Sequence, residues 1–234
     1  MPKHELRNLY PEVHASGSLQ SAMQSALAAI DSPLVAEASA EFFPGSFARI
    51  KRGPRFSQTY IAALERLFMP DFWSHGVQFA TGQTPDLAAT ASAIHDWLTI
   101  GNLTTAELAL RYPWITPSEK AAVFESGNAV EWTWTHMLES TNRSEATLVA
   151  IRRAYQEPAL RCLFPYTSMF SLCFSRCTGY PYTQDISSIT PVGDGLYAAG
   201  ESDGPKDIDG AIAAVLRSLP PGCGPARPGT ADDM

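Results

Sequence analysis

The stretch from Phe174 to Thr183 reads FSRCTGYPYT and brings a guanidinium, a thiol and two phenols into ten positions. Arg176, Tyr180 and Tyr182 follow an apolar run, and Asp185 comes shortly after them. An arginine, two phenols and a carboxylate at the end of a strand can bind an anionic or zwitterionic ligand. The same pattern is equally typical of tyrosine rings that cover the edge of a core while their hydroxyl groups stay in water.

Two residues are candidate catalytic bases, because a carboxylate or an imidazole can accept a proton from a reacting group. They are Asp185 and His75, and His75 lies just before a predicted strand in DFWSHGVQF. Histidine titrates near neutral pH, but a single histidine among aromatic residues is also typical of a packed, hydrogen-bonded side chain. Cys177 is the candidate nucleophile of a hydrolase, although no base lies near it in the sequence.

A second candidate binding site is the turn in ATGQTPDL, where a predicted strand turns through Gly82 into a helix. We expect Thr84 to be the N-cap and Pro85 to be the first helical residue. Backbone N–H groups at a helix start favour anions, and a glycine lets a ligand approach the backbone closely. An ordinary capped helix start explains the same residues.

Arg49, Lys51, Arg52 and Arg55 place four positive charges within seven positions of an otherwise acidic chain. In a strand, Arg49 and Lys51 would share one face. The run suits an acidic protein partner, or a sulfate or phosphate held by the arginine fork. A solvated strand edge that discourages aggregation is an equally good interpretation.

Composition excludes several classes of protein. A formal net charge of −7 over 234 residues argues against a nucleic-acid binder. No apolar run approaches the roughly 20 residues of a membrane span, and the N-terminal segment has no signal-like apolar core, so we expect a cytoplasmic protein without a membrane partner. The four cysteines fit no zinc pattern, and no phosphate-loop or dinucleotide motif is present, so we expect no metal and no cofactor.

The elements that would position these residues indicate an α+β fold. Helices are predicted over 19–30, 85–98, 144–155 and 208–219, with short helices after capping-box residues Thr104 and Thr116. Strands are predicted over 47–56, 76–81, 169–175 and 187–199, and residues 130–137 fit either state. We therefore expect one domain over residues 1–220, helix-rich in its first two thirds, with a small, mainly antiparallel sheet completed by the last third. Residues 221–234 are predicted to be a disordered tail.

Three segments, FATGQTPDL, LFPYTSMFSLCFSRCTGYPYTQD and PVGDGLY, resemble a family of actinobacterial proteins of unknown function that are labelled natural product biosynthesis proteins. The resemblance runs from about residue 10 to about residue 219. The chain also resembles one component of the two-component enzymes that close an aziridine ring in azinomycin-type pathways. That resemblance implies a second subunit encoded nearby, and an acidic carrier protein that bears the amino-acid-derived substrate.

The chemistry implied by this resemblance is displacement of sulfate by a neighbouring amine, which needs no metal or redox cofactor. Asp185 or His75 would take the amine proton, and Arg176, the basic run or the turn at Gly82 and Thr84 would stabilise the departing charge. The alternative is a non-catalytic binding, self-resistance or scaffolding protein. In that case exposed aromatic residues, including Trp132 and Trp134, would form an interface.

Overall fold

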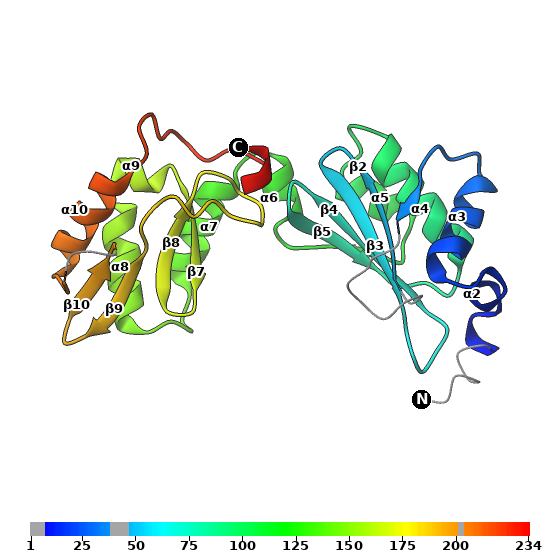
Figure 1. Ribbon diagram of the computed structural model, residues 1–234, viewed down its shortest axis with the longest axis horizontal. Coiled ribbons are helices and arrows are strands. Elements are labelled where there is room, and N and C mark those ends of the chain that lie inside the picture. Colours follow the sequence, from blue (N-terminus) through cyan, green and yellow to red (C-terminus); the bar gives the residue numbers. More distant parts are fainter. Residues whose placement is uncertain (1–7, 38–46, 201–203) are drawn as a thin grey trace. The chain divides into compact units, whose positions relative to one another are not determined.

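The computed structural model describes residues 8–37, 47–200 and 204–234, so the first seven residues of the N-terminal segment lie outside the described part. The chain divides into two compact units, residues 1–125 and 126–234 (Figure 1). The sequence predicted a single domain over 1–220. The division follows from the apolar residues, which form one core within each unit. A hydrophobic pattern identifies the core-facing positions but does not tell which of two cores each of them joins.

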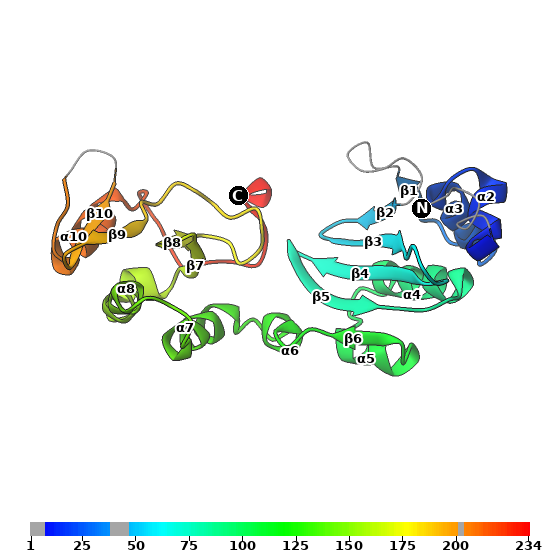
Figure 2. The same cartoon turned by 90° about the horizontal axis from the view of Figure 1, so that it is seen from below.

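The first unit contains a six-stranded antiparallel sheet and five described helices. Two helices precede the strands in the sequence, two come between β5 and β6, and one follows β6. Its elements are α2 (Pro11–Ser16), α3 (Leu19–Ala28), β1 (Ala36–Glu37), β2 (Phe47–Arg52), β3 (Arg55–Ile61), β4 (Phe68–Ser74), β5 (Val77–Gly82), α4 (Leu87–Thr99), α5 (Thr105–Arg111), β6 (Ile115–Pro117) and α6 (Ala121–Glu125). The strands are ordered β1-β2-β3-β4-β5-β6, so each strand pairs with its neighbour in the sequence (Figure 2).

Alternation along the central strands puts their apolar residues on the face that α3 and α4 cover. Phe72 and Phe79 meet the buried ring of Trp97 on α4 edge to face. The indole N–H of Trp97 donates to the carbonyl of Trp73 on β4 at 3.3 Å. Helix α4 is therefore joined to the sheet by both aromatic packing and a hydrogen bond.

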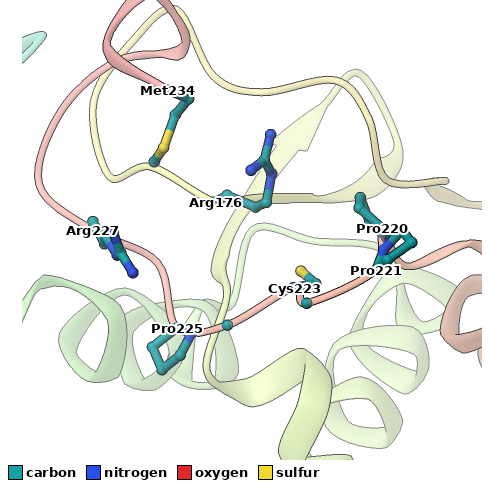
Figure 3. A pocket seen from close by; sticks show the side chains of 9 residues that line it. Arg176, Pro220, Pro221, Cys223, Pro225, Arg227 and Met234 are labelled. Atoms are coloured by element: carbon teal, nitrogen blue, oxygen red, sulfur yellow. The ribbon is translucent and has the colours of Figure 1, made fainter.

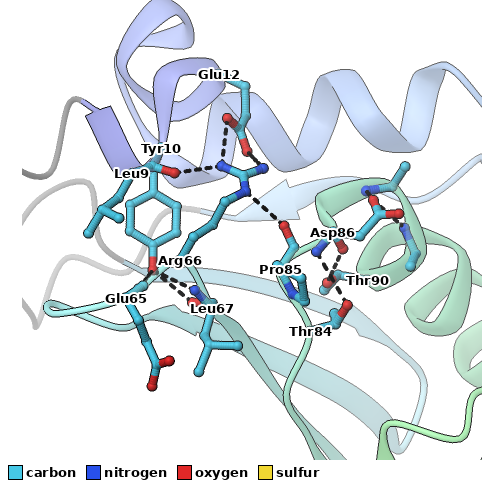
Figure 4. Close-up of polar contacts among 12 residues, drawn as sticks. Leu9, Tyr10, Glu12, Glu65, Arg66, Leu67, Thr84, Pro85, Asp86 and Thr90 are labelled. Atoms are coloured by element: carbon cyan, nitrogen blue, oxygen red, sulfur yellow. Dashed lines mark hydrogen bonds and ion pairs between the residues drawn. The ribbon is translucent and has the colours of Figure 1, made fainter.

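A polar cluster fixes the N-terminal helix α2 to the start of β4 (Figure 4). The hydroxyl oxygen of Tyr10 accepts the N–H of Leu67, and its single O–H lies within hydrogen-bond distance of the carbonyls of Ala62, Glu65 and Leu67. Arg66 forms a bidentate ion pair with Glu12 and also donates to the carbonyl of Leu9. Such a fork-to-fork pair is geometrically specific, so α2 is held in one orientation.

The second unit contains a four-stranded antiparallel sheet ordered β10-β9-β8-β7. Its elements are α7 (Ala129–Glu139), α8 (Glu145–Tyr155), α9 (Pro158–Arg161), β7 (Phe164–Ser168), β8 (Ser171–Ser175), β9 (Ile189–Gly193), β10 (Leu196–Ala199), α10 (Ile208–Ser218) and the 3₁₀ helix η1 (Ala231–Asp233). Helices α7, α8 and α10 pack against the sheet and enclose the core. The predicted α+β class with antiparallel strands is confirmed, and the strands are divided between two sheets, one in each unit.

The C-terminal segment is ordered, where the sequence predicted a disordered tail from residue 221. Its backbone runs beside the loop that follows β8 and exchanges hydrogen bonds with it. The segment is rich in proline and glycine, which is also typical of a disordered segment, and its order comes from contacts with residues far away in the sequence.

Three predicted helix starts are confirmed at their caps: Ser18, Ser144 and Asp207 each accept a backbone N–H of the first turn. The capping box at Thr104 is also present. The box predicted at Thr116 is wrong, because Thr116 lies in β6, where it pairs with β5. Residues 130–137, for which the sequence left both states open, belong to helix α7.

Candidate functional site

The motif that contains Arg176 is a rigid loop between the end of β8 and Thr183. Ser175 closes it: its hydroxyl oxygen accepts the backbone N–H groups of Cys177 at 3.1 Å and Thr183 at 3.2 Å. The backbone N–H of Arg176 donates to the hydroxyl oxygen of Thr183 at 2.9 Å. Because both ends of the loop are held by buried polar groups, the backbone under the Arg176 side chain is fixed.

The C-terminal segment braces the same loop from the other side. The N–H of Arg227 donates to the carbonyl of Arg176 at 2.9 Å, and the carbonyl of Arg227 accepts the N–H of Thr178 at 3.0 Å. Further along, the N–H of Gly179 donates to the carbonyl of Gly229 at 2.8 Å. This pairing brings the backbones of Arg176 and Arg227, about fifty residues apart in the sequence, side by side.

Arg176 and Asp185 form an ion pair, with 2.8 Å between Nη2 and Oδ2 and 36% of each side chain exposed. The Nε atom of Arg176 is buried and has no hydrogen-bond partner among the described residues. The guanidinium group therefore has one buried donor whose bonding capacity is unused in this state.

Arg176 lines a hollow of about 190 Å³, here called the arginine hollow (Figure 3). The remaining lining residues come from the C-terminal segment and are Pro220, Pro221, Gly222, Cys223, Gly224, Pro225, Arg227 and Met234. Two guanidinium groups and no side-chain carboxylate belong to this lining. Burial raises the pKa of the Cys223 thiol, and the neighbouring Cys162 and Asp185 add to this while Arg176 opposes it. Cys223 is thus a neutral thiol at neutral pH, so the charged side chains of this lining are the two guanidinium groups, of which Arg176 is paired with Asp185.

Asp185 lines a second hollow of about 570 Å³, here called the hydroxyl hollow. Its wall is polar and carries the side chains of Gln184, Ser187, Ser188 and Thr190, together with Ile186, Ala198 and Gly200. Among the described residues that line it, Asp185 is the only ionisable one. The two partners of the ion pair therefore line different hollows, Arg176 the arginine hollow and Asp185 the hydroxyl hollow.

The two tyrosines of the motif lie outside both hollows. Tyr182 stacks on Tyr166 of β7, with ring centroids 4.4 Å apart, and burial raises the pKa of its phenol. Burial likewise raises the pKa of Tyr166 to about 12. Tyr180 is 70% exposed and meets Tyr182 edge to face. For Tyr182 the interpretation as an edge-covering ring is the better one, and the prediction that both phenols contact the substrate gains no support from the geometry.

Cys177 is fully buried, and its thiol lies near Ser175 Oγ and the carbonyl oxygens of Gly179 and Pro181. These contacts tie the two arms of the loop together. A buried thiol surrounded by backbone carbonyls is a packing group, so the geometry does not support the hydrolase alternative.

The candidates His75, Gly82 and Thr84 belong to the first unit. His75 occupies the two-residue turn between β4 and β5, and its Nδ1 lies 2.9 Å from the Ser74 hydroxyl oxygen. A Cβ atom on Gly82 would lie 2.5 Å from the ring of Trp114, so this glycine is explained by close packing of an indole. The structure thus gives both residues local structural roles.

The sequence predicted that Thr84 is the N-cap of α4, and this prediction is wrong. Thr84 forms a backbone bridge with Phe68, and Asp86 caps the helix by accepting the N–H groups of Ala88 and Ala89. The carboxylate of Asp86 occupies the position that a bound anion would take at this helix start. The predicted anion site at Gly82 and Thr84 is therefore filled by the protein itself.

The predicted basic patch is divided by the structure. Arg55 donates to the carbonyls of Trp97, Ile100 and Leu103 and lies over the ring of Trp97, so it caps the C-terminal end of α4. Arg49 lies over the ring of Phe56, 4.5 Å from its centroid. Lys51 and Arg52 remain exposed and border a hollow of about 380 Å³ whose other lining residues are Pro33, Leu34, Val35 and Glu37.

Sequence reasoning missed Arg227, because the segment PPGCGPARPG has the composition of a disordered tail. The sequence also predicted that both Trp132 and Trp134 are exposed and available for an interface. Trp134 is fully buried and donates to the carbonyls of Arg161 and Leu163, whereas Trp132 stacks on His136 one helical turn away. Only Trp132 can contribute to an interface.

Within the described ranges, no group of three or more His, Cys, Asp or Glu side chains is arranged to hold a metal ion. Among the same residues, no helix has both the length and the apolar composition needed to cross a membrane.

Comparisons with known proteins give one similarity. The searches of the curated proteins and of the solved structures find no match to this chain. Residues 128–230 match a family model described as "Family of unknown function (DUF6193)". The matched range covers Arg176, Asp185 and Arg227, and thus the ion pair and most of the lining of both hollows. The part of the chain that carries the candidate site is therefore similar to a family whose function is unknown.

Proposed function

We propose that the second unit binds an anionic, amino-acid-derived intermediate across the Arg176–Asp185 ion pair and closes an aziridine ring on it with loss of sulfate. The observation that carries this proposal is the position of the ion pair between the arginine hollow and the hydroxyl hollow. A sulfate ester with an amine on the adjacent carbon has its negative charge and its nitrogen only a few bonds apart. Such a molecule can contact the guanidinium and the carboxylate at once.

Binding would exchange one ion pair for two contacts with the substrate. The sulfate would be bound by Arg176 and Arg227, which both line the arginine hollow. This would draw Arg176 away from Asp185 and leave the carboxylate facing the substrate amine. Guanidinium groups suit this task, because their fork binds sulfate oxygens in a bidentate manner.

The chemical step is an intramolecular displacement. The lone pair of the neutral amine attacks the adjacent carbon, a C–N bond forms, and the C–O bond breaks with its electrons leaving on sulfate. Asp185 accepts the proton that the nitrogen loses, so the monoanionic sulfate ester loses one hydrogen sulfate overall, as a proton on Asp185 and a sulfate dianion. Arg176 and Arg227 stabilise the charge that develops on the leaving oxygen. Holding the amine opposite the leaving group removes conformational freedom before the reaction.

The resemblance of the sequence supports the wider setting of this proposal: a cytoplasmic tailoring enzyme, or enzyme subunit, of actinobacterial natural product biosynthesis. In that setting the substrate is delivered on an acidic carrier protein, and a second subunit encoded nearby completes the enzyme. Lys51 and Arg52, which remain exposed, are the part of the basic run suited to the carrier. His75 is not needed in this scheme.

The test is intact-mass spectrometry of the carrier-bound intermediate, incubated with this protein alone and then with the product of the neighbouring gene added. Turnover should remove one sulfuric acid. Arg176→Ala and Asp185→Asn should abolish turnover while the circular dichroism spectrum stays unchanged. Arg152→Ala is the matched control, since Arg152 is an exposed arginine of the same unit whose ion pair with Glu145 lies outside both hollows. Full activity in both site variants would exclude this site.

A second candidate function, sequestration of the intermediate or product without chemistry, is favoured by one observation. Asp185 is already engaged by Arg176 at 2.8 Å, as expected for a pair that shapes a binding site. In that case the same incubation would leave the mass unchanged, and the ligand would bind tightly and be lost in Arg176→Ala. Binding without a change in mass, with the neighbouring protein present, would thus assign the site to a binding or self-resistance protein.

A further inference from the structure

A second feature of the second unit concerns the other end of its sheet. The hairpin between β7 and β8 turns through Met169 and Phe170, which are 95% and 73% exposed. Met169 has φ +54°, in the left-handed region that favours glycine, asparagine and aspartate. Both the backbone conformation and the exposure of two large apolar side chains are unfavourable for the isolated fold.

The neighbouring hairpin of the same sheet provides a direct comparison. The turn between β9 and β10 is built from Gly193, Asp194 and Gly195, which all have positive φ and are residue types that adopt it readily. The β9–β10 turn therefore has ordinary turn residues, whereas the β7–β8 turn has Met169 and Phe170 at the corresponding place. Strained positions that persist are typically retained for a function other than folding.

The two tips lie side by side. Leu172 pairs antiparallel with Ile189, and the hydroxyl oxygens of Ser171 and Thr190 are 2.7 Å apart, so both turns lie at the same end of the sheet. Val192 and Leu196, at the second tip, are 50% and 39% exposed. Met169, Phe170, Val192 and Leu196, the exposed apolar side chains at this end of the sheet, are here called the tip patch.

Opposite charges lie at the two ends of the tip patch. Arg143 lies at the β7 end, where its Nη1 donates to Thr167 at 2.9 Å and its Nε is buried without a hydrogen-bond partner among the described residues. Asp194 lies at the other end, on the exposed turn of the β9–β10 hairpin. In a twofold arrangement the same surface meets itself in reverse. Arg143 of one copy would then face Asp194 of the other, and the apolar side chains would meet between them.

We propose that the tip patch is the interface of a homodimer, formed with a second copy of this chain. The balance of charge around the patch supports this occupant over a membrane, because membrane-surface binding relies on clusters of lysine and arginine. The four side chains offer on the order of 400 Å² to a partner, about half of what a stable interface buries on each side. Because this area is small, we expect a weak dimer whose formation depends on protein concentration. Arg176 lies at the opposite end of β8, so dimerisation leaves the candidate site free.

The test is sedimentation equilibrium from about 5 µM to about 500 µM, a range suited to a weak dimer. The wild-type chain should change from monomer to dimer across it. The double variant Met169→Asn/Phe170→Gly introduces a turn sequence that the hairpin favours, so it should remain monomeric while its melting temperature stays equal or rises. Leu64→Asn is the matched control, because Leu64 is 85% exposed but belongs to the first unit, and it should dimerise as the wild type does.

Charge exchange tests the twofold arrangement itself. Arg143→Glu and Asp194→Lys should each weaken the dimer several-fold at low salt, and the two together should restore it. A wild-type chain that remains monomeric at the highest concentration would overturn the proposal, as would a dimer that survives the Asn-Gly substitution. Co-sedimentation of the wild type with phosphatidylcholine or phosphatidylserine vesicles, lost in the Asn-Gly variant, would assign the patch to a membrane and also overturn it.

Discussion

Arg55 is the residue of the basic run whose structural role can be tested most sharply, because it caps a helix while Lys51 and Arg52 are exposed. Its guanidinium group donates to the carbonyls of Trp97 at 3.0 Å, Ile100 at 3.2 Å and Leu103 at 3.0 Å. It also lies 4.2 Å from the centroid of the Trp97 ring. These carbonyls belong to the last turn of α4 and the residues after it, which have no partners within the helix. We therefore predict that Arg55 stabilises the first unit rather than docking a partner.

The size of the effect follows from these contacts. A hydrogen bond from a charged donor contributes about 1.5–3 kcal/mol in buried surroundings, and less where water can replace it. A cation over an aromatic ring adds about 0.5–1 kcal/mol. Because the site is only partly buried and water can rehydrate the carbonyls, we expect Arg55→Ala to lower the free energy of unfolding by about 2–4 kcal/mol. Arg55→Lys should lose most of the same energy, since an ammonium group cannot serve three carbonyls and stack on a ring.

The assay is urea unfolding followed by tryptophan fluorescence, to which Trp97 beneath the guanidinium group contributes together with the four other tryptophans. Lys51→Ala, an exposed residue of the same run, is the control and should change the free energy of unfolding by less than about 0.5 kcal/mol. If Arg55→Ala destabilises the protein no more than Lys51→Ala does, the capping role is refuted. Arg55 would then again be a candidate for binding an acidic partner.

Three further predictions follow from single residues. Gly82→Ala should lower the free energy of unfolding by about 1–3 kcal/mol in urea titrations, because the new Cβ would lie 2.5 Å from the ring of Trp114. Burial raises the pKa of Glu12, but the hydrogen bonds and charge of Arg66 outweigh it, so the folded pKa lies below the unfolded one. The ion pair therefore adds stability above about pH 4.3 that is lost as the pH falls through the folded pKa, and Glu12→Gln should lower the melting temperature at pH 7 but not at pH 2. Cys177→Ala should lower the melting temperature yet leave ligand binding and any turnover intact, and complete loss of turnover in a folded Cys177→Ala protein would revive the hydrolase alternative.

Local chemistry explains why many elements were predictable. Ser18, Ser144 and Asp207 cap helices through hydrogen bonds to residues three positions away, so the sequence alone contains both partners. The start of α4 shows the limit of this reasoning. Thr84 and Asp86 are both good capping residues, and the choice between them depends on the pairing of Thr84 with Phe68 on another strand.

The candidate site shows the same division between local and long-range information. The motif around Arg176 and the nearby Asp185 could be identified, because a few positions of sequence contain both charges. Arg227 could not, since its place depends on backbone hydrogen bonds between segments about fifty residues apart. Neither hollow could be predicted, because a cavity is a property of the packed surface. Arg55 and Lys51 likewise differ in role although they lie in one charged run.

The most direct test of the account is a titration of the protein with 2-aminoethyl sulfate, which carries an amine and a sulfate ester on adjacent carbons, followed by NMR and calorimetry. The account predicts saturable binding, with amide shifts confined to the Arg176 loop, the segment around Asp185 and the segment around Arg227. Arg227→Ala should weaken binding by about tenfold or more, as expected for one lost charge-assisted contact, and Arg152→Ala should leave it unchanged. Absence of binding, or shifts that map elsewhere, would contradict the assignment of the two hollows and their shared ion pair as the functional site.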